Sequence, residues 1–317
     1  MNQTWKFIQD KLETKTKVML LVVIDSYGSS PGRPGFKMAV AGDGTMKGSV
    51  GGGVSEYRLA EMAKKKLKTS NPKITIKREV HQPDAEEDSS GMICSGEQWV
   101  AFYPVPQKAL ATVRSIISAI SEGKKGMIRF TQNGFDFNQN ISLSGELKRQ
   151  VHSDKDWLLT EETGNQNHLY IFGAGHVGLA LSQVMSRLDF VIHLFDNRKN
   201  LNTFHENNHA NDHQIIDYKK ISHLVPESDK SFVVIMTFGH GSDKMVLEQL
   251  INKDIKYLGM MGSEKKVDAV FKQMQKEGIA KRSLQKVHAP IGLSITSKTP
   301  REIAISIAAE IIAVKNG

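Results

Sequence analysis

The sequence predicts an α/β protein that ends in a doubly wound parallel sheet. From residue 168 onward, apolar segments of strand length alternate with amphipathic segments of helix length. Parallel neighbours need a crossover, and a helix between consecutive strands supplies it. Before residue 150, short strands are instead separated by glycine turns, a pattern that indicates an α+β domain. A chain of 317 residues is long enough for both domains.

The first domain is expected to span residues 1–150. Apolar residues at helical spacing indicate a helix at its start, and period-two or continuous apolar runs indicate its strands. Residues 133–167 are polar with weak periodicity, so we expect a linker that continues to about residue 165. The expected helices are 5–13, 55–68 and 108–122, and the expected strands are 17–25, 37–40, 74–80, 98–105 and 126–130.

The second domain is expected to span residues 166–317. Its strands are short and apolar throughout, as strands of a parallel sheet covered on both faces are. The expected strands are 168–172, 190–195, 232–236 and 257–260, and the expected helices are 177–187, 242–252, 264–276 and 301–314.

Composition favours a folded cytoplasmic protein. Hydrophobic residues make up 39% of the chain and charged residues 24%. The net charge of +8 permits anionic partners. No arginine-rich arm or aromatic track is present, so we expect no nucleic-acid partner, and the apolar run 18–24 is too short to span a membrane. The single cysteine, Cys94, excludes an internal disulfide and a cysteine-rich zinc site.

The segment IFGAGHVG carries the glycine pattern of a dinucleotide-binding loop. Gly173, Gly175 and Gly178 follow an expected strand and open an expected helix. The first glycine permits the tight turn, the second permits close approach of a phosphate, and the third permits close helix packing. The helix N-terminus supplies N–H donors for a diphosphate. This context predicts a Rossmann-like domain that binds a nucleotide or pterin phosphate, unless the fold has lost its ligand.

The next strand ends in Asp196, where a carboxylate can accept hydrogen bonds from two ribose hydroxyls. We therefore expect a preference for an unphosphorylated ribose. Arg198 lies two residues further on and could accommodate a 2′-phosphate instead.

A second glycine loop, GSVGGGVSE, lies in the first domain. Gly51, Gly52 and Gly53 allow backbone amides to converge on an anion ahead of a helix that carries Glu56, although a tight strand-to-helix connection would explain them as well. Cys94 is either a small buried side chain or, if deprotonated, a ligand for a soft metal.

Histidines give weaker indications of a site. His205, His209 and His213 recur every four residues, but the asparagines between them disfavour a helix and no metal motif surrounds them. His240 is better placed because it follows a strand of the parallel sheet, whereas His288 could be a buried structural histidine.

These motifs together resemble the XdhC/CoxI family of accessory proteins for xanthine dehydrogenase and related molybdenum hydroxylases. The resemblance covers most of the chain and rests on GSSPGRPG, GDGTMKGSVGGGVSE, ICSGE, IFGAGHVG, FDNR, MTFGHGSD, YLGMMGSEKK and APIGLSITSKTPREIAISIAAEI. It implies an N-terminal XdhC/CoxI domain, a C-terminal Rossmann domain, and a protein that binds molybdenum cofactor (molybdopterin). The implied activity supports sulfuration of that cofactor by a cysteine-dependent sulfurtransferase and delivers it to a xanthine dehydrogenase-type apo-enzyme.

Several family positions carry over and others differ. The resemblance implies cofactor-binding roles for the glycine loops, for Glu56 and Cys94, and for the family-pattern segments after the later strands. It makes Cys94 the metal ligand that is kept, while Val54 and Phe238 stand where the family has cysteine and histidine, and Ser294 stands where it has aspartate. The implied positions in the second domain beyond the glycine loop and Asp196 are Thr237, His240, Asp243, Gly262, Ser263 and Lys266.

Three functions remain open from the sequence. The first is a cofactor-handling accessory protein without turnover of its own, which we expect to be a homodimer with both glycine loops, Cys94 and His240 lining one cleft between the two domains. The second is an NAD(P)-dependent oxidoreductase with His240 or Lys266 near the nicotinamide. The third is an interaction protein that keeps the fold without its ligand.

Overall fold

The computed structural model describes residues 2–81, 96–139, 149–153, 155–188 and 190–317. The chain forms two compact units, Met1–Asn165 and Gln166–Gly317. Cys94 and the sulfur ligand expected there lie outside the described residues. No helix in the described ranges is long and apolar enough to cross a membrane.

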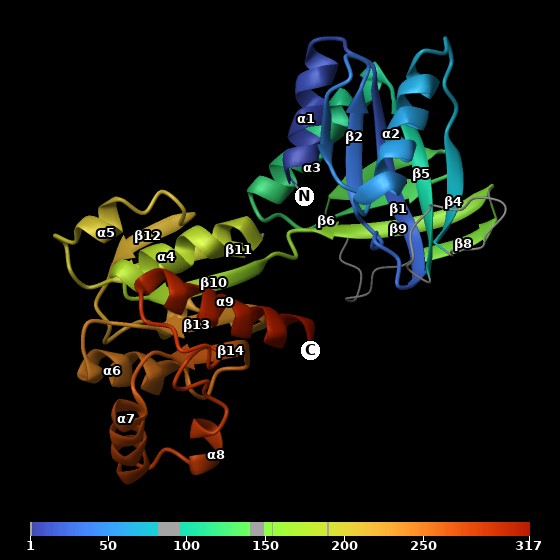
Figure 1. Ribbon diagram of the computed structural model, residues 1–317. Coiled ribbons are helices and arrows are strands. Elements are labelled where there is room, and N and C mark those ends of the chain that lie inside the picture. The colour runs from blue at the N-terminus through green and yellow to red at the C-terminus, as the bar shows by residue number, and fades with distance from the viewer. Residues whose placement is uncertain (1, 82–95, 140–148, 154, 189) are drawn as a thin grey trace. The chain divides into compact units, whose positions relative to one another are not determined.

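The first unit contains two antiparallel sheets (Figure 1). One sheet has the strand order β3-β2-β1-β5-β4 and the other has the order β7-β6-β9-β8. The strands are β1 (Val18–Gly28), β2 (Lys37–Ala41), β3 (Met46–Gly48), β4 (Thr75–His81), β5 (Gly96–Val105), β6 (Gly126–Thr131), β7 (Gly134–Gln139), β8 (Arg149–Ser153) and β9 (Asp156–Thr163). The helices are α1 (Asn2–Glu13), α2 (Gly53–Leu67) and α3 (Leu110–Ser121).

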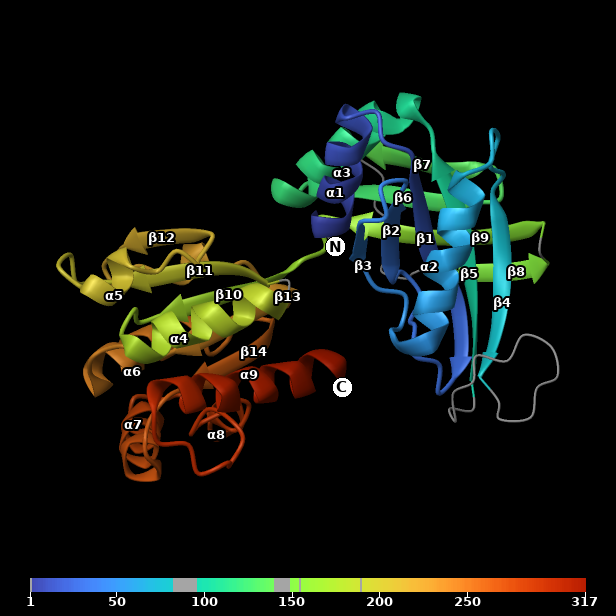
Figure 2. The same cartoon turned by 45° about the horizontal axis from the view of Figure 1, so that its top comes forward.

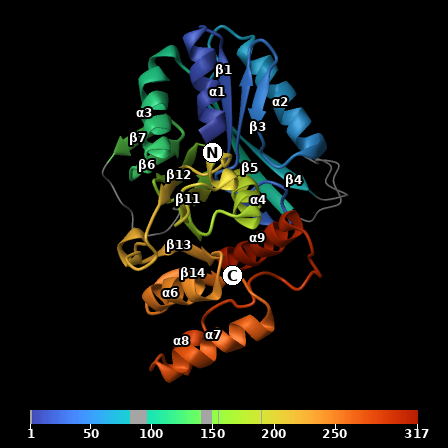
Figure 3. The same ribbon diagram turned by 90° about the vertical axis from the view of Figure 1, so that its left-hand side faces the viewer.

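Both faces of the larger sheet are covered, which explains why β1 is apolar in both side-chain directions. Helices α1 and α3 pack on one face and α2 packs on the other (Figure 3). Trp5 of α1 is fully buried and stacks on Phe130 of the second sheet, with ring centroids 6.4 Å apart. The second sheet therefore closes the core that α1 and α3 share with β1.

The second unit is a five-stranded parallel sheet with the order β12-β11-β10-β13-β14. Its strands are β10 (Asn167–Phe172), β11 (Phe190–Asp196), β12 (Asp212–Ile215), β13 (Ser228–Ile235) and β14 (Ile255–Met260). Its helices are α4 (His176–Met185), α5 (Asn202–His205), α6 (His240–Leu250), α7 (Glu264–Lys276), α8 (Lys281–Leu284) and α9 (Pro300–Asn316). The fold class expected from the sequence is confirmed, including a Rossmann-type sheet covered on both sides.

Each face of this sheet has its own core. Helices α4 and α9 lie side by side over one face (Figure 2), and α6 and α7 cover the other. The order in which strands are added to the sheet reverses at β10, because β11 and β12 extend to one side and β13 and β14 to the other. Ligands of such sheets bind where the strand order reverses, beyond the carboxyl ends of the strands.

The prediction that residues 133–167 form a linker is wrong. That stretch contributes β7, β8 and β9 to the smaller antiparallel sheet. Strands β7 and β8 are short edge strands with most side chains partly or fully exposed, and β9 is largely buried but contains only three consecutive apolar residues, so hydrophobic periodicity did not reveal them. Strand β12 was also missed, because it has only four residues, of which Ile215 alone is apolar, and lies largely exposed at the edge of the parallel sheet.

A capping box begins α9. The Thr299 side chain accepts a hydrogen bond from the backbone N–H of Glu302, and the Glu302 side chain accepts one from the backbone N–H of Thr299. We expect Thr299→Ala to lower the free energy of unfolding by about 1 kcal/mol, because the cap at the start of the helix is lost. Chemical denaturation would measure this. Lys298→Ala, which keeps the backbone N–H that bonds to Glu302, is the control, and equal losses in both variants would contradict the assignment.

Candidate functional site

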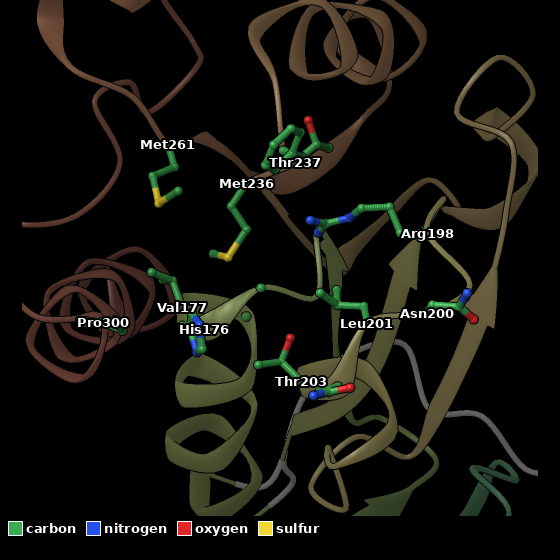
Figure 4. Close-up of a pocket in the computed structure, with 14 residues that line it drawn as sticks. His176, Val177, Arg198, Asn200, Leu201, Thr203, Met236, Thr237, Met261 and Pro300 are labelled. Carbon is green, nitrogen blue, oxygen red and sulfur yellow. The ribbon is translucent and has the colours of Figure 1, made fainter.

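A cavity of about 740 Å³ lies at the carboxyl ends of the parallel strands (Figure 4). The residues that line it follow four different strands or begin α9. They are Gly175, His176, Val177 and Gly178 after β10; Arg198, Asn200, Leu201, Asn202 and Thr203 after β11; Met236, Thr237 and Phe238 after β13; Met261 after β14; and Pro300. The position and the size are those of a small-molecule site in a doubly wound sheet.

The three glycines of the predicted fingerprint occupy three distinct environments. Gly173 has a φ of +120°, and a Cβ there would lie 2.1 Å from the backbone oxygen of Met236. A Cβ on Gly178 would lie 2.3 Å from the backbone oxygen of Gly173, so the start of α4 packs directly on the turn. Gly175 has open space where its Cβ would be and lines the cavity. The backbone at Gly175 is therefore accessible to a ligand phosphate.

Asp196 ends β11 and is fully buried. One carboxylate oxygen accepts a hydrogen bond from the backbone N–H of Ala174 at 2.8 Å, and the other accepts one from the backbone N–H of Arg198 at 2.9 Å. Burial raises the pKa of this carboxyl, but the hydrogen bonds from Arg198 and Ala174 outweigh it, and the net shift is downward. Asp196 does not line the cavity. It ties the glycine turn to the end of the neighbouring strand.

Arg198 reaches the cavity while bonded to Asp196. Its Nε and Nη2 donate to the two carboxylate oxygens at 2.9 and 2.8 Å, a bidentate geometry that fixes the guanidinium plane. Hydrogen bonding to Asp196 raises the pKa of Arg198 further above its ordinary value. The guanidinium lies 5.2 Å from the ring centroid of Phe238, a residue that is 85% exposed. Figure 4 shows the side chain extending toward the Met236 and Thr237 side of the cavity.

An ion pair between a buried carboxylate and a partly exposed lysine supports the segment that carries Phe238. Asp243 of α6 is fully buried and accepts hydrogen bonds from the backbone N–H and the hydroxyl of Thr237 at 2.8 and 2.7 Å. Lys266 of α7 donates to Asp243 and to the backbone oxygen of Met261, the latter at 3.1 Å. The expected site residues Asp243 and Lys266 therefore contact each other rather than the cavity.

Two further expected residues of this domain, Gly262 and Ser263, contact Lys266. Ser263 is the N-cap of α7 and accepts a hydrogen bond from the backbone N–H of Lys266. Gly262 lies against the aliphatic part of the Lys266 side chain. His240 is the first residue of α6, is exposed, and does not line the cavity. Of the implied set after β13 and β14, only Thr237 lines it.

The glycine loop of the first unit binds an anion that belongs to the chain itself. One carboxylate oxygen of Glu56 accepts hydrogen bonds from the backbone N–H groups of Val50 and Gly52 at 2.8 and 3.0 Å, and from the Ser49 hydroxyl at 2.6 Å. Gly51, Gly52 and Gly53 all have positive φ, as the expected nest requires. A Cβ on Gly51 would lie 2.7 Å from the backbone nitrogen of Gly32, so this loop is also a tight connection. An external anion would have to displace Glu56.

Three polar side chains lie next to one another on the adjacent strands β10, β11 and β12, and none of them lines the cavity. His168 Nδ1 and His193 Nε2 are 3.0 Å apart, and His193 Nδ1 lies 3.7 Å from an Asp212 carboxylate oxygen. Burial lowers the pKa of both histidines; the neighbouring His193 lowers that of His168 further, whereas Asp212 partly offsets the effect at His193. Both rings are therefore held in the neutral form to a lower pH than in the unfolded chain.

This pair predicts a loss of stability in acid. Protonation is easier in the unfolded chain, where the pKa is about 6.5, so the free energy of unfolding should fall as the pH drops from about 7 through that value toward the lowered pKa values of the fold. Denaturation of wild type and of His168→Gln at pH values from about 5 to about 7.5 would measure it. The variant should show a shallower slope, and His223→Gln, which changes an exposed histidine, should not. A wild-type stability that rises in acid would contradict the assignment.

Sequence reasoning missed most residues of the cavity wall. Asn200 lies in no motif, and Met236, Phe238 and Met261 lie in family-pattern segments but were not assigned to a binding site. Each follows the carboxyl end of a parallel strand, and that position is the signal that could have identified them.

Comparisons with known proteins cover both units. The XdhC Rossmann domain family model matches residues 169–311, and the XdhC and CoxI family model matches residues 12–78. An uncharacterized Escherichia coli protein, YqeB, is 27% identical over 304 residues, which is 93% of this chain but only 43% of YqeB. A Bacillus subtilis protein described as a probable xanthine dehydrogenase component is 20% identical and is covered over 94% of its length.

A solved structure agrees over nearly the whole chain. The crystal structure of a Bacillus halodurans protein described as a xanthine dehydrogenase has a TM-score of 0.75 and 23% identity, with 99% of this chain and 96% of that chain covered. Among the residues described, no cluster of three or more metal-ligating side chains occurs. With its N-terminal match and its Rossmann-domain match in the expected order, the chain belongs to the XdhC and CoxI family.

Proposed function

We propose that this chain is an accessory protein for a xanthine dehydrogenase-type molybdenum hydroxylase. It binds molybdenum cofactor, presents it for sulfuration by a cysteine-dependent sulfurtransferase, and passes it to the apo-enzyme. The proposal combines family membership with the names of two relatives, since the Bacillus proteins are described as xanthine dehydrogenase or a component of it. YqeB is more than twice as long as the stretch it shares with this chain, so its further activities do not transfer.

The observation that carries the proposal is the chemistry of the cavity wall. One side offers the N–H groups at the start of α4 together with the Arg198 guanidinium, and none of the described lining residues is a carboxylate. The other side is formed by Met236, Met261 and the exposed ring of Phe238. A planar pterin that carries a phosphate needs an anion site next to an apolar wall, so the residues present fit the organic part of the cofactor.

Each part of the chain then has a limited task. The α4 N-terminus and Arg198 hold the phosphate, the methionines and Phe238 hold the ring system, and the Asp243–Lys266 pair keeps the Phe238 segment in place. When bound, the molybdenum centre supplies the chemistry of exchanging an oxo ligand for sulfur. The protein contributes orientation and exclusion of water.

The departures from the family pattern limit how the metal could be held. Val54, at the position of the family cysteine, is 53% exposed at the start of α2, and its side chain offers no ligand. Cys94 is the remaining thiol, and we propose it as the metal ligand. That both glycine loops and Cys94 share one cleft stays a prediction.

An NAD(P)-dependent oxidoreductase is less well supported. Its two candidate proton-transfer groups, His240 and Lys266, do not line the cavity, and Lys266 is engaged by Asp243 and Met261. The titratable side chains that do line the cavity are His176 and Arg198. The cavity can bind a nucleotide, but the described residues give it no acid–base pair for hydride chemistry.

Co-expression with a client enzyme tests the proposal. A xanthine dehydrogenase-type apo-enzyme would be produced in a molybdenum-replete host with or without this chain, and its cyanide-releasable sulfur and activity would be measured. We expect the chain to raise both several-fold and Arg198→Met to remove most of the gain. Arg187→Met, beyond the opposite end of α4, is the matched control. A client that is sulfurated equally well without the chain would refute the proposal.

A further inference from the structure

The carboxylate at the end of β11 is not arranged as in a site that binds the two ribose hydroxyls of a nucleotide. Such a site needs a carboxylate that faces the ligand and can accept two hydroxyl hydrogen bonds. Here the Asp196 carboxylate is fully buried, lies behind the cavity wall, and already accepts hydrogen bonds from Ala174 and Arg198 at its two oxygens. A ribose diol would have to break these bonds to reach it.

Arg198 is the group that the ligand meets at this position. Asp196 engages its Nε and Nη2, so the Nη1 donors are not used by the ion pair. The guanidinium also lies over the ring of Phe238, which restricts its rotation. A guanidinium fixed in this way is prepared to bind a phosphate without losing much further conformational entropy.

The charges and the ring around Arg198 favour the same ligand. No carboxylate occurs among the described lining residues, and the nearby Asp196 carboxylate is paired with Arg198. Arg198 covers one face of Phe238, and 85% of the residue remains exposed, which leaves aromatic surface for a planar heterocycle.

We propose that the cavity selects ligands that place a phosphomonoester at Arg198, after the end of β11, beside a planar heterocycle, with Arg198 as the specificity-determining residue and Asp196 as its positioning residue. The phosphomonoester takes the place that a free ribose diol has in NAD-type sites. The expectation from the sequence that Asp196 favours an unphosphorylated ribose is thereby replaced by the alternative that Arg198 offered. This inference deepens the proposed function, on which it rests for the identity of the cavity as the cofactor site.

Two probes that differ in one phosphate test the selectivity. Calorimetric titration of the full chain would compare 2′,5′-ADP with 5′-AMP. We expect 2′,5′-ADP to bind about tenfold tighter, because it adds a charge-assisted contact with Arg198. Equal affinities, tighter binding of 5′-AMP, or no binding of either probe would overturn the proposal.

Three variants separate selectivity from general binding. Arg198→Met should bring the affinity ratio close to one, because the contact that only the 2′-phosphate of 2′,5′-ADP makes is lost, and an unchanged ratio would overturn the proposal. Phe238→Ala should weaken both probes equally and leave the ratio unchanged, because stacking does not distinguish them; a collapse of the ratio would argue against the role of Arg198. Asp196→Asn should reduce the ratio to an intermediate value, since Arg198 loses its charged anchor.

Analysis of the ligands carried by the purified chain distinguishes the source of the phosphomonoester. NADP(H) in a heat extract would identify a nucleotide, and a phosphorylated pterin would identify the molybdenum cofactor. Either result supports the selectivity rule, whereas NAD(H) or an unphosphorylated pterin as the main content would overturn it. Failure of the proposed function would instead appear as an unchanged client enzyme while the affinity ratio persists.

Discussion

Gly173→Ala is expected to destabilise the second unit strongly. Alanine disfavours the φ of +120° at this position, and its Cβ would lie 2.1 Å from the backbone oxygen and 2.5 Å from the backbone carbon of Met236. Neither atom can move without shifting β13. Backbone strain and the clash together should lower the free energy of unfolding by on the order of 4 kcal/mol, which chemical denaturation would measure.

Gly175→Ala is the matched control, and it should weaken ligand binding without lowering the stability of the fold. Gly175 has a φ of −70°, and no heavy atom lies within 4 Å of the position of its Cβ. Stability should change by less than about 0.5 kcal/mol, while the added methyl group blocks the approach of a phosphate and weakens 2′,5′-ADP binding about tenfold or more. Equal losses of stability in both variants would contradict the separate roles assigned to these glycines.

Lys266→Ala is expected to destabilise the protein by about 3 kcal/mol, because it leaves the buried Asp243 carboxylate without its counter-ion. Thr237 still donates to Asp243, so the domain should fold. The Phe238 segment should be less well fixed, and the affinity for both nucleotide probes should fall together. Thermal denaturation and titration would measure the two effects.

Lys265→Ala tests whether the effect depends on the ion pair. Lys265 is the exposed neighbour on the same helix, and its removal should change stability by less than about 0.5 kcal/mol. If the two alanine variants behave alike, the Asp243–Lys266 pair does not stabilise the segment after β13.

The fold was predictable where the hydrophobic pattern was long and regular. Strands β10, β11, β13 and β14 contain continuous apolar runs because both faces of the sheet are covered. The glycines between β10 and α4 indicated the turn before that helix. Strands β7, β8 and β12 lie at sheet edges, where polar side chains are tolerated and the pattern disappears.

The site was only partly predictable for a different reason. Sequence reasoning placed Gly175 and Arg198 at the correct strand ends because the Rossmann topology determines where those ends meet. It could not determine which polar groups would pair with each other. Glu56 bonds to the loop that precedes it, and Asp196 bonds to Arg198, so each carboxylate already has protein partners at the position where a ligand contact was expected.

The molybdenum and pterin content of the purified full chain tests the central claim most directly. Protein from a molybdenum-replete host with an active cofactor pathway would be analysed for molybdenum by mass spectrometry and for pterin by fluorescence after oxidation. We predict that wild type and Arg187→Met carry both in comparable amounts and that Arg198→Met carries much less. Wild-type protein without molybdenum and pterin, from a host in which the client enzyme is fully loaded, would contradict a role in binding the cofactor.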